Sequence, residues 1–278
     1  MPCRDMLIVI DEAASAAARL APAATLAKRL NARLTGLYAT GFPIGTTYGD
    51  LAGWAELMDA FMAAQRAEAN AAEAAFRQEL GRYQIEGDWV YSETDRTRSI
   101  IDRARLYDLV VLAQPDPDAE PRLQPPLRLE EVVLACGRPV LVIPYAGPFA
   151  DLGHRALVAW NGSREATRAL HDALFLLEGA EAVTVVEIDP AVNEAGEPGL
   201  GAADVAAFLT RRGIAAEAET ARSDDVAVPD LLLSRAAEIG ADVIVMGAYG
   251  HSRLREYVLG GASRSIFHQM TVPVLMAH

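Results

Sequence analysis

Asp242-Val-Ile-Val-Met-Gly-Ala-Tyr-Gly250 carries the strongest information about the architecture of this chain. An apolar, β-branched run leads directly into glycines, which is typical of a buried strand that ends in a tight loop. Gly260-Gly261 then precedes a segment expected to be a helix from about Ala262, and an apolar strand follows at 273–277. The order strand, glycine loop, helix, strand predicts an α/β protein with a parallel sheet.

The glycines of this loop have two interpretations. Without a Cβ in the way, their backbone N–H groups can approach an anion, and the free N–H groups at a helix start favour phosphate. This interpretation predicts a nucleotide phosphate site. The alternative is that the glycines only close tight turns after a strand.

A second copy of the same unit lies in the first half of the chain. Asp108-Leu-Val-Val-Leu112 matches Asp242-Val-Ile-Val-Met246, and Arg138-Pro-Val-Leu-Val142 matches Val272-Pro-Val-Leu-Met276. Both matches share an offset of 134 (242 − 108 and 272 − 138). The constant offset indicates two related domains in one chain.

The start of each copy fixes the domain limits. Leu7-Ile-Val-Ile-Asp11 matches Leu157-Val-Ala-Trp-Asn161 at an offset of 150 (157 − 7), 16 more than the later offset, so the first copy contains extra residues. We place most of them at Gly41 to Trp54. The predicted domains are 1–146 and 152–278, joined by a short linker that holds them close together.

Each copy alternates β-branched runs with helical stretches, which predicts strands covered by helices on both faces. The second copy is expected to have strands near 155–160, 182–188, 215–220, 242–246 and 273–277, and helices at 164–178, 201–212, 228–240 and 262–270. The first copy follows the same order, with a long helix from about Ala55 to Arg82. Ser163, and Asp224 with Asp225, are expected to cap helices. We predict two doubly wound domains packed with pseudo-twofold symmetry.

The first copy lacks the glycines of the second. At the offset of 134, the residues Ala113, Asp116, Pro126 and Leu127 replace Gly247, Gly250, Gly260 and Gly261. An acidic side chain and prolines without N–H groups stand where a phosphate needs donors. Since the flanking strands agree and only the glycines differ, we predict that the second copy alone binds a nucleotide.

Composition limits the function classes. The net charge of −13 over 278 residues disfavours nucleic acid and anionic membranes as partners. Two cysteines are too few for a disulfide framework, and five histidines without metal-ligand spacing predict no metal site. Without an apolar run of about 18 residues or a signal-type start, a cytoplasmic location is expected.

These residues resemble the universal stress protein family in its tandem two-domain form. The family motif G-x2-G-x9-G is matched by Gly247-Ala-Tyr-Gly250, the nine residues His251 to Leu259, and Gly260-Gly261-Ala262-Ser263. The resemblance implies a five-stranded parallel sheet of order 3-2-1-4-5 in each domain. It also implies that ATP lies between the ends of the first and fourth strands of the second domain, the switch point of such a sheet.

Carried over position by position, the resemblance implies a set of nucleotide-binding residues. Gly247, Gly250, Gly260, Gly261 and Ala262 would line the ribose and phosphates, Asn161 would lie near the adenine or ribose, and Glu187 and Ile188 would offer backbone to the adenine. Gly261 stands where the family has Ser or Thr, and Asn161 where it has an acid; Ser263 would supply the hydroxyl. Arg253 either reaches the outer phosphates or is a solvated surface residue.

The expected function is a stress-response regulatory protein that binds ATP, ADP or AMP, with Mg²⁺ accompanying a triphosphate. No catalytic residue is identified, and at most slow ATP hydrolysis is expected, because the loop lacks the lysine and hydroxyl of a Walker sequence. A ligand-independent tandem scaffold acting through protein association is the alternative. An enzyme of the ATP pyrophosphatase class ranks third, since its S-G-G-x-D-S loop is absent. The chain would be an intramolecular pseudo-dimer with an unknown protein partner, acting alone or as a homodimer.

Overall fold

The computed structural model describes residues 2–10, 13–41, 54–118, 127–147, 149–190, 199–248 and 261–278. Within its helices, the side chains of residues 13–18, 54–55, 57 and 261–264 are outside the description. The insert expected at Gly41 to Trp54 therefore lies outside the described residues except for its two end positions.

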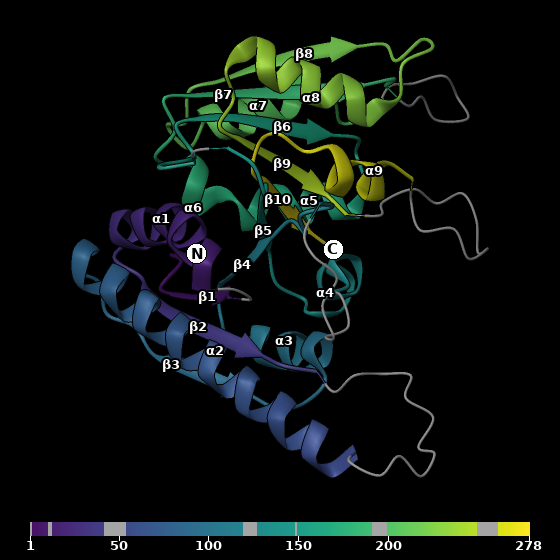
Figure 1. Cartoon of the computed structure of the whole chain (residues 1–278). Helices are drawn as coiled ribbons and strands as arrows, with labels where there is room; N and C mark the ends of the chain where they lie inside the picture. Colours follow the sequence, from purple (N-terminus) through teal and green to yellow (C-terminus); the bar gives the residue numbers. More distant parts are fainter. Residues whose placement is uncertain are drawn as a thin grey trace.

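The described strands form one ten-stranded sheet in the order β3-β2-β1-β4-β5-β10-β9-β6-β7-β8 (Figure 1). The strands are β1 Asp5–Val9, β2 Arg33–Ala39, β3 Trp89–Ser92, β4 Leu109–Ala113, β5 Val140–Ile143, β6 Arg155–Trp160, β7 Ala182–Ile188, β8 Ala216–Ala221, β9 Val243–Gly247 and β10 Val274–Ala277. All strand pairs within each half are parallel. The doubly wound α/β class predicted from the sequence is confirmed.

The two halves join through β5 and β10, which pair antiparallel with Leu141 opposite Leu275. These leucines are equivalent in the two copies (275 − 141 = 134), so the register is symmetric about them. An approximate twofold axis perpendicular to the sheet therefore passes between them. Because the pairing is antiparallel, the carboxyl ends of the parallel strands point to opposite edges of the sheet in the two halves.

Helices cover both faces of this sheet. One face carries α1 Ala13–Leu30, α2 Trp54–Tyr83, α5 Arg164–Asp172, α6 Leu174–Leu177 and α7 Ala202–Thr210, and the other carries α3 Arg96–Ala104, α4 Leu129–Ala135, α8 Val228–Ile239 and α9 Gly261–Gln269. On each face, one cluster of buried apolar side chains contains residues of both halves. The hydrophobic core is therefore continuous across the seam between β5 and β10.

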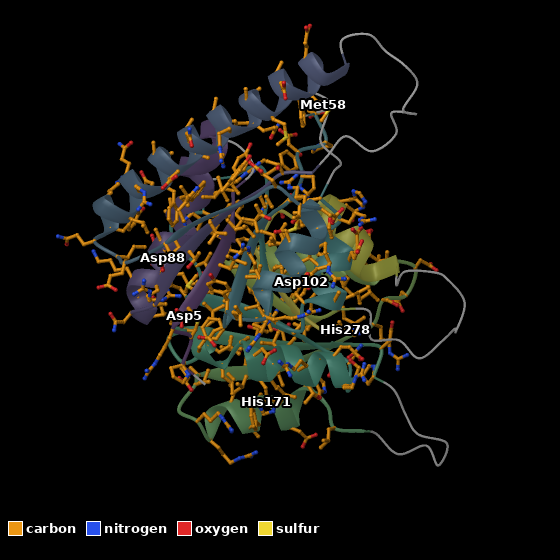
Figure 2. The ribbon with its side chains drawn as sticks, turned by 90° about the horizontal axis from the view of Figure 1, so that it is seen from below. Asp5, Met58, Asp88, Asp102, His171 and His278 are labelled. Carbon is orange, nitrogen blue, oxygen red and sulfur yellow. The ribbon has the colours of Figure 1, made fainter. Side chains whose placement is uncertain are left out.

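The long helix α2 packs on this core through its second half. Among the side chains of α2 that the structure describes, the buried apolar ones are Ala69, Ala72, Phe76 and Leu80, at the spacing of one helix face. The first turns of α2, where Met58 lies, extend beyond the sheet (Figure 2).

Helix ends differ from expectation at two places. The helix expected at 164–178 is interrupted at Ala173, with α5 before it and α6 after it. Ser163 caps α5 as predicted, because its Oγ accepts a hydrogen bond from Ala166 N at 3.1 Å. The expected capping of α8 by Asp224 and Asp225 is wrong, since the N-cap is Ala227 and makes no side-chain cap.

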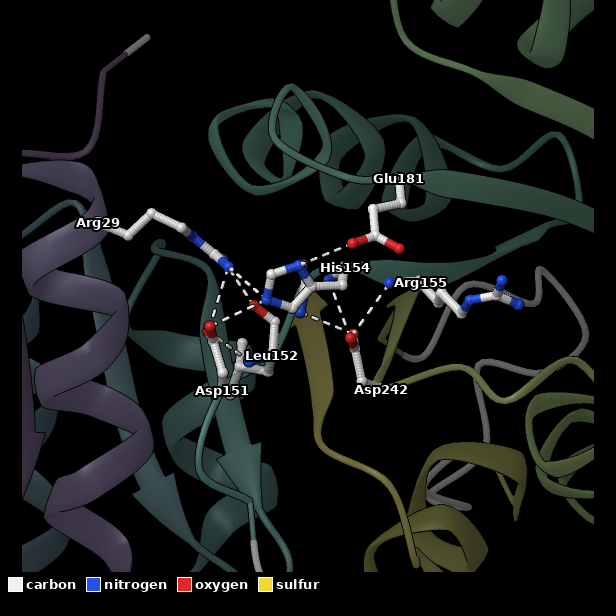
Figure 3. A network of polar contacts seen from close by, with 8 residues as sticks. Arg29, Asp151, Leu152, His154, Arg155, Glu181 and Asp242 are labelled. Carbon is white, nitrogen blue, oxygen red and sulfur yellow. Dashed lines mark hydrogen bonds and ion pairs between the residues drawn. The ribbon is translucent and has the colours of Figure 1, made fainter.

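Equivalent carboxylates stabilise the start of each half. Asp242 accepts hydrogen bonds from the backbone N–H groups of Gly153, His154 and Arg155 at 2.7 to 3.1 Å (Figure 3). In the first half, Asp108 accepts from two backbone N–H groups, those of residues 4 and 5, at 2.8 and 3.1 Å. The aspartate that precedes the fourth strand of each copy therefore holds the residues that lead into the first strand.

Among the helices of the described residues, none has the length and apolar composition needed to cross a bilayer. Both cysteines, Cys3 and Cys136, are buried and free.

Candidate functional site

The candidate site lies where β6 and β9 end side by side. These parallel neighbours pair from Ala156 and Val243 to Ala159 and Met246. The helix that follows β6, α5, packs on one face of the sheet, whereas the helix that follows β9, α9, packs on the other. The chain thus leaves the two adjacent strand ends in opposite directions, which is the switch point at which open α/β sheets bind ligands.

The described residues bring part of the predicted set to this edge. Asn161 directly follows β6, Gly247 ends β9, Glu187 and Ile188 end β7, and Gly261, Ala262 and Ser263 form the first turn of α9. Gly250, Arg253 and Gly260 lie outside the described residues. The strand register places Asn161 level with Ala248, so the ends of β6 and β9 flank the start of the glycine loop.

Gly247 has a packing role. A Cβ at this position would lie 2.5 Å from Ala166 N and 2.6 Å from the carbonyl carbon of Glu165. Such distances are shorter than real Cβ contacts, so only glycine lets the end of β9 lie against the first turn of α5. Close packing against α5 therefore accounts for this glycine, so the phosphate interpretation depends on the other glycines.

Asn161 shapes the loop that follows β6. Its Oδ1 accepts a hydrogen bond from Ser163 N at 3.1 Å, and Ser163 in turn caps α5. Gly162 between them has φ of 70°, the left-handed region that favours glycine. An asparagine oxygen forms such a turn with the backbone two residues on, a local signal that the sequence analysis missed.

The loop before α7 is held by two side chains from neighbouring strands. Glu187 Oε2 accepts from Ala202 N at 3.0 Å, at the first residue of α7, and Trp160 Nε1 donates to Leu200 O at 2.8 Å. A Cβ at Gly201 would lie 2.9 Å from Glu187 Oε2. Glu187 therefore binds the start of α7, while the side chain of Leu200 stays 72% exposed at the same edge.

A charged group lies beside Gly247. Glu165 is buried and pairs with Arg164 through Oε1, at 3.0 Å from Nε and 2.9 Å from Nη2. Burial raises the pKa of Glu165, but backbone and Arg164 hydrogen bonds and the charges of Arg164 and His278 outweigh it, so the pKa falls below 4.5. Glu165 is therefore ionised at neutral pH.

His278 reaches the same place from the end of β10, with Nδ1 at 3.1 Å from Ala248 O. A carbonyl oxygen can only accept, so Nδ1 donates and holds the residue that follows β9. His278 was not among the residues expected at this site from the sequence. Within the residues described, no group of three or more His, Cys, Asp or Glu side chains could hold a metal ion.

The fold and this edge define a tandem doubly wound α/β protein with a glycine-bearing switch point in its second half. Residues 153–278 match the profile of the Universal stress protein family. The second half is therefore a universal stress protein domain, and the resemblance drawn from the sequence is confirmed. No curated protein matches the chain by sequence.

Two solved structures share the fold over nearly the whole chain. A universal stress protein from Archaeoglobus fulgidus DSM 4304 is 17% identical, with 100% of this chain and 99% of that chain covered and a TM-score of 0.70. A functionally unknown protein from Pseudomonas aeruginosa PAO1 is 14% identical, with 99% and 92% covered and a TM-score of 0.57. At these identities the likeness shows the tandem fold alone.

Proposed function

We propose that the second half binds ATP, or ADP or AMP, at its glycine loop, and that the chain is a stress-response regulatory protein with little or no catalysis. One observation carries the proposal: α9 begins at Gly261, the second glycine of the Gly260-Gly261 pair, next to the switch point between β6 and β9. The first N–H groups of a helix have no partner within the helix, and its dipole favours an anion there.

Each predicted residue has a role in this proposal. The backbone N–H groups of Gly250, Gly260, Gly261 and Ala262, the hydroxyl of Ser263 and the guanidinium of Arg253 bind the phosphates, with Mg²⁺ accompanying ATP. Asn161 lies nearest the ribose, and the backbone of Glu187 and Ile188 meets the adenine. Gly247 contributes by letting α5 approach, and the exposed Leu200 offers apolar contact to the base.

The first half has a different role in this proposal. Asp116 and Pro126 take the places of two loop glycines, and the carboxyl ends of its strands lie at the opposite edge of the sheet. We therefore assign nucleotide binding to the domain 152–278 and leave the domain 1–146 as its partner in an intramolecular pseudo-dimer. Other protein partners would read the bound state.

The cytoplasm is the proposed location. Burial raises the pKa of Cys3 to about 12 and also raises the pKa of Cys136, so both free thiols are kept protonated. Buried protonated thiols suit a reducing compartment.

Calorimetric titration with ATP, ADP and AMP, with and without Mg²⁺, tests the proposal. The Gly250→Asp variant copies Asp116 of the first half and should weaken binding at least about tenfold, because a carboxylate repels phosphate. Gly81→Asp is the matched control, since a Cβ at Gly81 on α2 meets nothing within 4 Å. Equal affinity of wild type and Gly250→Asp would sink the assignment of the site, and no binding of any nucleotide would favour the ligand-independent scaffold.

A further inference from the structure

Gln114 of the first half is buried and makes hydrogen bonds through both ends of its side-chain amide. It follows β4 directly and is 2% exposed. Its Nε2 donates to Phe267 O on α9 at 2.8 Å, and its Oε1 accepts from Tyr145 N at 3.2 Å. The side chain is therefore fixed in one orientation across the seam between the halves.

The acceptor of this bond lies in the last turn of α9. The carbonyl groups of the last turn have no partner within a helix unless a following residue supplies one. Ile266 O receives Met270 N at 2.8 Å, whereas Phe267 O receives the amide of Gln114. A residue 153 positions earlier in the chain thus completes the carboxyl end of α9.

The first half makes this hydrogen bond to the second half, but the equivalent position of the second half cannot make it to the first. At the offset of 134, Gln114 corresponds to Ala248 and Phe267 to Val133. The backbone is equivalent at both places, because Gln114 N donates to Ile143 O at 2.8 Å and Ala248 N donates to Ala277 O at 2.9 Å. An alanine side chain has no donor, so the second half cannot return the bond to α4.

We propose that Gln114 is a positioning residue through which the first half fixes α9 and thereby sets the affinity of the second half for nucleotide phosphate; this role rests on the proposed function. The nine residues of α9 span about 13 Å, so the helix moves as one rigid piece. Holding its carboxyl end holds its amino end, where the phosphate N–H groups lie. The half without the glycine loop thus keeps the first turn of α9 in the other half preorganised, and preorganisation raises affinity.

The test compares the wild type with Gln114→Met, which keeps the length of the side chain and removes both the donor to Phe267 O and the acceptor for Tyr145 N, and with Gln114→Glu, which keeps an acceptor for Tyr145 N. Gln78→Met, on the exposed side of α2, is the matched control. We expect ATP to bind about 3- to 10-fold more weakly to Gln114→Met, the usual contribution of one hydrogen bond. In the ligand-free protein, amide hydrogen exchange in residues 261–270 should be faster in this variant and unchanged in the control.

The Gln114→Glu variant supplies a readout that a loss of packing would not give. Its carboxylate cannot donate to Phe267 O, but its protonated form can, so its ATP affinity relative to wild type should be low at pH 8 and recover toward pH 5. Faster exchange in α9 with unchanged ATP affinity would overturn the positioning role while leaving the proposed function intact. Failure of the wild type to bind any nucleotide would overturn the proposed function and this role together.

Discussion

Arg29, on α1 of the first half, lies 3.2 Å (Nη1 to Oδ1) from Asp151 in the segment that leads into β6 (Figure 3). Its Nη2 also donates to Leu152 O at 2.6 Å. His154 Nε2 lies 2.9 Å from the second oxygen of Asp151. Gly153 has φ of 87°, the left-handed region that favours glycine, and a Cβ there would lie 2.4 Å from Leu176 Cδ1. This polar cluster ties the first half to the start of the second.

Asp151 should make stability depend on pH at acidic values. Burial raises the pKa of Asp151, but hydrogen bonds from His154 and from Leu152 N, and the charge of Arg29, outweigh it and lower the pKa below 3.8. A lowered pKa stabilises the folded state above the unfolded pKa, and this contribution is lost as the pH falls through the folded pKa. Asp151→Asn should therefore be less stable than the wild type at pH 7, and the difference should shrink as the pH falls through the pKa of the folded Asp151 carboxyl.

The expected loss is about 0.5 to 1 kcal/mol, since the Asp151 side chain is 41% exposed and solvent screens the pair. Urea unfolding of Asp151→Asn and wild type between pH 3 and 7 measures it, with the exposed Asp225→Asn as control. A difference that stays constant down to pH 3 would contradict the ionic origin.

The strands were predictable from sequence because parallel strands buried on both faces are nearly continuous apolar runs. Such runs can be recognised without knowing which strands pair. In the second half, the predicted strands match the observed ones to within one residue. The break of the helix at Ala173 was not predictable, since neither Ala173 nor the apolar Leu174 that follows it disfavours a helix. Asp224 looked like a cap, but it adopts φ of 46° and lies outside the helix start.

The candidate site was predictable only where its signal is local. The glycine spacing and the Ser163 cap depend on residues a few positions apart, and the sequence displays such spacings directly. The hydrogen bonds from Ala202 N to Glu187 and from Gln114 to Phe267 O join residues 15 and 153 positions apart. Such pairs meet only because the sheet brings their elements together, and no local pattern marks them.

The β5 and β10 seam should couple the two halves in unfolding. Leu275 is fully buried opposite Leu141, so Leu275→Ala should cost about 2 to 5 kcal/mol by leaving a cavity. Leu106→Ala is the control, because Leu106 is 82% exposed and should change stability by less than about 0.5 kcal/mol. Fluorescence in urea of variants that keep only Trp89 or only Trp160 should report the same lowered midpoint from each half. Two separate midpoints would show that the seam does not couple them.

The equivalent aspartates should differ in their contribution to stability. Asp242 accepts hydrogen bonds from three backbone N–H groups and Asp108 from two. Removing the carboxylate leaves each of these N–H groups without its acceptor. We expect Asp242→Ala to cost about 2 to 4 kcal/mol and Asp108→Ala to cost less, measured by chemical denaturation at pH 7. An equal or larger loss for Asp108→Ala would show that the number of N–H groups does not determine the effect.

Gly247→Ala should destabilise the fold even in the absence of any ligand. The added Cβ would meet two backbone atoms, Ala166 N at 2.5 Å and Glu165 C at 2.6 Å, so α5 must shift at a cost of about 1 to 3 kcal/mol. Gly81→Ala should instead increase the free energy of unfolding by up to about 1 kcal/mol, because alanine favours the helix and its Cβ meets nothing within 4 Å there. Thermal unfolding of ligand-free protein distinguishes the two.

If Gly247→Ala is as stable as wild type, the close approach of β9 to α5 does not constrain this position, and its glycine must serve the ligand. If it is less stable, weaker nucleotide binding by this variant cannot be assigned to the phosphate contact, which is why Gly250 is the position to substitute in the binding test.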